Sequence, residues 1–150
     1  MSFAVLAAAT TLVGGSNALP VPTVALLTGV HVGRTTATFE FRSAPAAVRA
    51  HVRPRSRIVE SGSGRRVPLK GNAFLVVSFS PASTAEVHGS TVKFSYTGPG
   101  RLRPSSRGPV QELVKIGDFE GQLDWAIGLD RRRAFTVARH GATVTVSFGA

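Results

Sequence analysis

Along most of the chain after residue 25, hydrophobic and polar residues alternate with a period of two. Phe39 and Phe41 fall on one face of the segment 37–42, whereas Glu40 and Arg42 fall on the other. Alternation of this kind is typical of β-strands that have one buried face and one face in water. The pattern therefore predicts a chain built mainly from half-buried strands.

Turn residues divide the alternating segments into a series of short strands. Strands spaced by about 8–12 residues favour an all-β fold, here an antiparallel β-sandwich or barrel with little helix. Residues 80–89 predict a loop or a short helical turn, and residues 98–109, rich in glycine, proline and serine, predict a long mobile loop. The predicted strands cover residues 26–32, 37–42, 48–53, 73–79, 92–96, 110–116, 123–129, 135–137 and 144–148.

The apolar positions of these strands define a candidate core. Segment 73–79 is the most apolar run, and we expect it to be buried on both faces. The residues expected to point inward are Phe39, Phe41, Phe74, Val76, Trp125, Ile127, Phe135, Val137, Val144 and Val146.

The first residues differ in character from the rest. Residues 3–13 are apolar and uncharged, and small residues at Ser16 and Ala18 match the pattern before a signal-peptidase cleavage site. About a dozen apolar residues are too few to span a bilayer, which takes about twenty. The pattern predicts a signal peptide at 1–18, a proline-containing linker at 19–25 and one domain at 26–150. The alternative is that the apolar run is a first strand or a buried helix of the domain.

The charge balance is strongly basic. Lysine and arginine number 18 against 8 acidic residues, a net charge of +10. Such a surface attracts polyanions, although an arginine-rich solvated surface without any partner is the plain alternative. Interleaved aromatic residues, which single-stranded nucleic-acid sites need, do not accompany the basic block, so we expect no nucleic-acid partner. The residues expected to form a basic binding face are Arg49, Arg53, Arg55, Arg57, Arg65 and Arg66.

No pattern of catalytic residues is recognisable. The chain has no cysteine, which excludes disulfides, thiol catalysis and a lipoprotein anchor. The metalloprotease, nucleophile-elbow, phosphate-loop and dinucleotide motifs are all absent from the sequence. The acidic segment 118–124 superficially resembles a calcium loop but lacks its order of ligands. We therefore expect a protein that is not an enzyme, with no metal site and no cofactor.

The acidic residues near the C-terminus have a structural interpretation. We expect Asp118, Glu120 or Asp130 to pair across a hairpin with the arginine triplet 131–133.

A resemblance to a known family covers residues 26–148. The segments Gly117-Asp118-Phe119-Glu120-Gly121 and Trp125-Ala126-Ile127-Gly128-Leu129-Asp130-Arg131-Arg132-Arg133 resemble the motifs of the AMIN-like domain of actinobacterial secreted proteins and lipoproteins. The sequence departs from the family where an Asp-Arg pair usually precedes the strand at 37–42, and where Ala134 replaces a proline.

The resemblance implies a β-sandwich outside the cytoplasmic membrane. AMIN domains proper serve as envelope-targeting and peptidoglycan-binding modules, so a binding role follows by analogy of fold. We expect an exported, extracellular or wall-associated module that binds peptidoglycan or an anionic cell-wall polymer. The alternative is an interaction domain that binds an envelope protein along a sheet edge. In either case we expect a monomer with at most a peripheral contact to the membrane.

Overall fold

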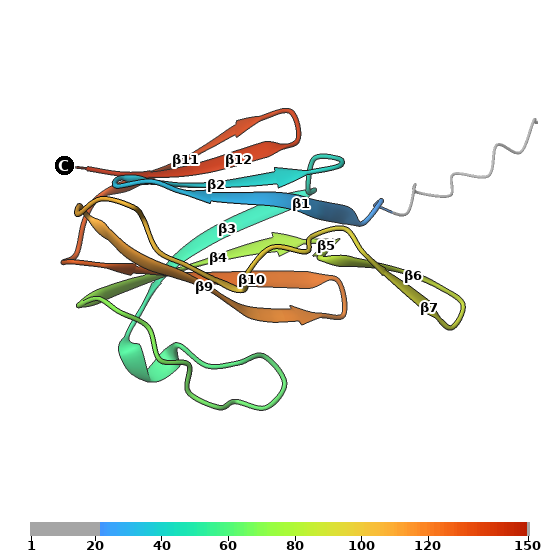
Figure 1. Ribbon diagram of the computed structural model, residues 1–150, viewed down its shortest axis with the longest axis horizontal. Coiled ribbons are helices and arrows are strands. Elements are labelled where there is room, and N and C mark those ends of the chain that lie inside the picture. Colours follow the sequence, from blue (N-terminus) through green and yellow to red (C-terminus); the bar gives the residue numbers. More distant parts are fainter. Residues whose placement is uncertain (1–21, 150) are drawn as a thin grey trace, which may run out of the picture.

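Two five-stranded sheets stack on one another in the computed structural model, which describes residues 22–149 (Figure 1). The first sheet has the order β11-β12-β2-β1-β5. Its neighbours are antiparallel except for the parallel pair β1 and β5. Its strands are β1 (Ala25–Val32), β2 (Thr36–Phe41), β5 (Ala82–Ser83), β11 (Phe135–His140) and β12 (Thr143–Phe148).

The second sheet is antiparallel throughout and has the order β3-β4-β10-β9-β8. Its strands are β3 (Ala47–Arg53), β4 (Ala73–Ser80), β8 (Arg101–Leu102), β9 (Val110–Phe119) and β10 (Gln122–Leu129). A separate hairpin of β6 (Ala85–His88) and β7 (Thr91–Phe94) projects from one end, and the single helical turn within residues 22–149 is η1 (Arg55–Arg57). The prediction of an all-β sandwich is confirmed.

The core lies between the two sheets and is centred on aromatic rings. The Phe39 ring lies 4.9 Å from that of Phe79 and 5.9 Å from that of Trp125, centroid to centroid. The Tyr96 ring meets Trp125 edge-on at 6.0 Å. Tilted and edge-on contacts are the arrangements that aromatic quadrupoles favour, so these rings fix how the sheets face one another.

Two of the residues expected in this core lie on the opposite face of β4, where Phe74 is buried and Val76 is partly buried. Phe74 and Val76 point outward, where Phe74 packs with Ile58 and Leu69, while the alternate residues of β4 face the first sheet. Residues 54–72, here called the covering segment, run over this outer face (Figure 1). Because β4 is covered on both sides, as expected, alternation within it does not reveal which set points to the core.

Val137 lies on the inner face of its sheet, as expected, but it is not buried in the core. Val137 pairs with the fully buried Val146 and lies on the same face of the sheet, yet 37% of its surface is exposed. Val137 is exposed because β11 is the last strand of its sheet and the opposite sheet does not cover it.

Two segments expected to be loops contain strands. Residues 80–89 include β5 and β6, and residues 98–109 include β8, which pairs with β9. The expected signal peptide at 1–18 lies outside the described residues, and β1 starts at Ala25, the last residue of the expected linker. Within residues 22–149 there is no helix of the length and apolarity that a membrane span requires.

Candidate functional site

A polar groove of about 330 Å³ lies on the outer face of the second sheet, on β3, β4 and the start of β10. We call it the basic groove. Arg49 and His51 alternate along β3 and lie opposite Ser78 and Val76 of β4, so both side chains are on the outer face. No carboxylate from the described residues lines the groove. Its lining residues are Ala47, Arg49, His51, Arg53, Ser78, Ser80 and Gln122.

The six arginines of the predicted basic face have different roles. Arg49 and Arg53 meet in the basic groove. Arg55 instead donates hydrogen bonds to the carbonyls of Leu69 and Gly71, at 3.1 and 2.6 Å, and its guanidinium lies 4.7 Å from the centre of the Phe74 ring. These contacts anchor the covering segment to the sheet. Arg65 pairs with Glu60 at 3.1 Å, whereas Arg57 and Arg66 are exposed on the covering segment.

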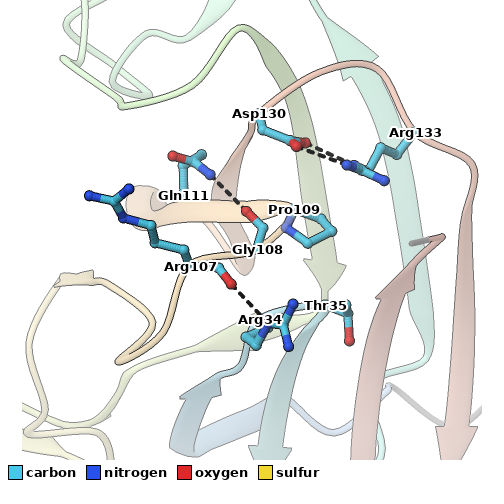
Figure 2. A pocket seen from close by; sticks show the side chains of 8 residues that line it. All are labelled: Arg34, Thr35, Arg107, Gly108, Pro109, Gln111, Asp130 and Arg133. Atoms are coloured by element: carbon cyan, nitrogen blue, oxygen red, sulfur yellow. Dashed lines mark hydrogen bonds and ion pairs between the residues drawn. The ribbon is translucent and has the colours of Figure 1, made fainter.

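A second, wider hollow of about 750 Å³ lies where three loops meet at one end of the second sheet (Figure 2). We call it the end hollow. The loops are the β1–β2 turn, the segment before β9 and the segment after β10. Backbone hydrogen bonds hold them together, from Val110 N–H to the Arg34 carbonyl and from Asp130 N–H to the Pro109 carbonyl, both at 2.9 Å. The hollow is lined by Arg34, Thr35, Arg107, Gly108, Pro109, Gln111, Asp130 and Arg133.

One wall of the end hollow is an ion pair within the family motif. Arg133 Nε and Nη2 donate to the two oxygens of Asp130, each at 2.8 Å, and Nη1 donates to the Gly149 carbonyl at 2.9 Å. The hydrogen bonds from Arg133 outweigh the opposing effect of burial and, with the hydrogen bond from the Arg131 N–H, lower the pKa of Asp130 to about 2. The expected pairing of an acid with the arginine triplet is thus confirmed for these two residues, but it joins positions three apart in one loop and does not cross a hairpin. Arg131 and Arg132 are exposed.

The remaining acids of the motif have other partners. Asp118 accepts hydrogen bonds from the backbone N–H of Thr84, at 2.9 Å, and from the Thr84 hydroxyl, so Asp118 is not the acid that pairs with the triplet. Glu120 and Gly121 form the β9–β10 turn with φ angles of 50° and 77°. Positive φ at both central positions is the geometry of a tight hairpin turn.

Several motif residues are structural. Trp125 is fully buried in the core. Gly117 faces Ser61 of the covering segment so closely that an added Cβ would lie 2.1 Å from the Ser61 Oγ. Phe119, in contrast, is 61% exposed. The motif therefore contributes strongly to the fold, and Asp130 and Arg133 are its residues that line the end hollow.

Sequence reasoning missed one buried charged group, Glu112 of β9. Only 1% of its side chain is exposed, and it pairs with Arg101 and Arg103, each at 3.0 Å, while the Lys70 N–H donates to it at 2.8 Å. Burial raises the pKa of Glu112, but these hydrogen bonds outweigh burial and leave the pKa below its usual value. The available signal was one acidic residue that precedes the alternate apolar residues Val114 and Ile116, with arginines nine and eleven residues before it.

Comparison with known proteins gives one match. A family model described as the AMIN-like domain matches residues 22–146. No curated protein and no solved structure matches the chain.

Proposed function

The chain belongs to the AMIN-like domain family, and from this we propose that it is a non-catalytic, exported module that binds an anionic polymer of the cell envelope in the basic groove. AMIN-like domains are binding or structural domains that occur in envelope and periplasmic proteins. The proposal adds the ligand class and the surface that binds it.

The observation that carries this proposal is the composition of the basic groove. Arg49, His51 and Arg53 project side by side from one strand over a floor that includes the hydroxyls of Ser78 and Ser80. Guanidinium groups bind carboxylates and phosphates through paired hydrogen bonds, and hydroxyls bind the neutral oxygens of sugars. Since no described carboxylate lines the groove, the positive charge of its arginines is left for a ligand.

Co-sedimentation with purified cell wall tests the proposal. The unmodified chain should pellet with wall at low salt and be released as the salt concentration rises, because exposed charges are screened beyond about 8 Å at physiological ionic strength. The variant R49S/R53S should bind substantially less. The matched control K93S/R131S removes the same charge from exposed positions outside the groove, and it should bind like the unmodified chain. Equal losses in both variants would show that net charge alone is responsible.

A second candidate function is the binding of an envelope protein along β11. This strand ends its sheet, and the side chains of residues 136–140 are exposed. A row of unpaired backbone groups at such an edge is a template for adding a strand. A photo-crosslinking residue at Val137 should then capture a defined partner protein, while wall binding should be absent or insensitive to R49S/R53S.

A further inference from the structure

The side chain of Gln122, the first residue of β10, lines the basic groove with its amide group held in one orientation. Its Nε2 donates to the two oxygens of Asp124, at 3.2 and 3.1 Å. A carboxylate accepts hydrogen bonds and cannot donate them, so the NH₂ group of the amide must face Asp124 and the carbonyl oxygen Oε1 must face away. Both side chains project from the outer face of β10, since they flank Leu123, which is buried in the core.

Asp124 is itself fixed before any ligand binds. Only 7% of the residue is exposed, and its Oδ2 also accepts a hydrogen bond from the hydroxyl of Ser61 on the covering segment, at 3.4 Å. Asp124 lines a neighbouring hollow of about 260 Å³ and does not line the basic groove, whereas Gln122 lines both. Within residues 22–149 no side chain or backbone group donates to Oε1 of Gln122, so this oxygen is available to a ligand.

This fixed acceptor complements the other groups of the basic groove. An arginine carries five N–H donors and no acceptor, and a serine hydroxyl can either donate or accept. Arg49 and Arg53 therefore suit any anionic group, whereas Oε1 of Gln122 requires a hydrogen-bond donor from the ligand. A ligand without donors that covers Oε1 leaves it unpaired. Leaving a polar group of the site unpaired is unfavourable, and this cost is what allows a site to reject such a ligand.

Given the function proposed above, on which this rests, we propose that Gln122 makes the basic groove selective for anionic polymers that also carry hydroxyl or amide donors, as sugar-containing polymers do. Because β4 separates β3 from β10 and neighbouring strands lie about 4.8 Å apart, Arg49 and Gln122 stand on strands about 10 Å apart. One polymer segment laid across the sheet contacts both. Asp124 orders the amide in advance, so the hydrogen bond to the ligand costs little further side-chain freedom. Gln122 is thus a specificity-determining residue and Asp124 a positioning residue.

Two polyanions that differ in hydrogen-bond donors test this proposal. Hyaluronan carries carboxylates together with hydroxyl and amide donors, whereas the ionised phosphates of polyphosphate offer no donor. Isothermal titration calorimetry at one low salt concentration measures the dissociation constant of each. Q122A removes the acceptor and should weaken the binding of hyaluronan by about two- to tenfold, the size of one hydrogen bond, while the binding of polyphosphate stays unchanged. The control Q111A changes a glutamine outside the groove and should leave both constants unchanged.

Further variants separate this selectivity from the function on which it rests. R49S/R53S should weaken the binding of both probes, because both need the arginines. D124N lets the Gln122 amide turn either way and should lower the preference for hyaluronan part of the way towards that of Q122A. Equal effects of Q122A on both probes, no effect on either, or binding of polyphosphate alone would overturn the selectivity and leave the groove as an anion site. If the unmodified chain binds neither probe at low salt, the proposed function fails and the selectivity fails with it.

Discussion

The Asp130 carboxylate and the Arg133 guanidinium form a two-pronged ion pair in which both oxygens are engaged at 2.8 Å. Its hydrogen bonds stabilise the ionised form of Asp130, whose pKa is about 2 in the folded chain against an ordinary 3.8. A lowered pKa means that stability is present above the ordinary pKa and is lost as pH falls through the folded-state pKa. The pair also connects β10 to the end of the chain through the bond from Arg133 to Gly149.

We therefore expect D130N to lower the melting temperature at pH 7. The difference between D130N and the unmodified chain should shrink as pH falls from about 4 to about 2, because both chains then lack the charge at this position. Thermal melts across this pH range provide the measurement, and E120Q, which removes an exposed charge at the β9–β10 turn, is the control. A pH-independent difference would show that the charge of Asp130 does not stabilise the fold.

The ion triplet of Glu112, Arg101 and Arg103 predicts unequal effects of removing its members. Glu112 is 1% exposed, whereas the two arginine side chains are 39% and 57% exposed. If Glu112 is removed, the two arginine side chains can be hydrated. If the arginines are removed, a buried carboxylate is left unpaired, which lowers the stability by about 3–5 kcal/mol. R101S/R103S should consequently unfold at lower urea concentration than E112Q, whose amide oxygen still accepts from the Lys70 N–H.

The pH dependence of R101S/R103S gives a second test of the same triplet. Loss of both arginines leaves burial to dominate and raises the pKa of Glu112, so this variant should become less stable as the pH increases through that pKa. E112Q has no ionisable group at this position and should not show this trend relative to the unmodified chain. Equal stabilities of the two variants at neutral pH would contradict the expectation.

The close approach of the covering segment to β10 predicts that Gly128 tolerates no side chain. A Cβ added there would lie 1.8 Å from the Lys70 carbonyl oxygen. G128A should lower the free energy of unfolding by about 3 kcal/mol or more, in the range of severe steric substitutions. The control is G100A, because nothing lies within 4 Å of a Cβ at Gly100. Chemical denaturation of both variants measures their free energies of unfolding. An unchanged free energy of unfolding in G128A would show that the covering segment can move away to make room for the added methyl group.

Period-two alternation predicted most of the strands, because a strand with one buried face and one exposed face alternates apolar and polar residues along its sequence. It failed where that condition does not hold. In β4 both faces are covered, so Phe74 and Val76 were assigned to the wrong side. In β9 irregularities in the pairing with β10 change which residues face the core, so Val110 lies in the core while Glu112 does not.

The candidate sites were less predictable than the fold. The placement of Arg49 and Arg53 on one exposed face of β3 could be predicted, since both belong to a single strand. The end hollow could not, because Arg34, Arg107 and Arg133 are brought together only by the packing of three loops far apart in the sequence. Local charge density also misled at Arg55, whose contacts to backbone carbonyls depend on the path of the covering segment.

Arg55 should therefore behave as a structural residue. R55S removes two hydrogen bonds and the stacking on Phe74, and it should lower the free energy of unfolding by about 1–3 kcal/mol. R57S removes the same charge from an exposed neighbour and should be close to neutral. Denaturant titrations compare the two, and wall binding by folded R55S at low temperature should match that of R57S. A loss of wall binding in R55S but not in R57S would show that Arg55 belongs to the binding surface.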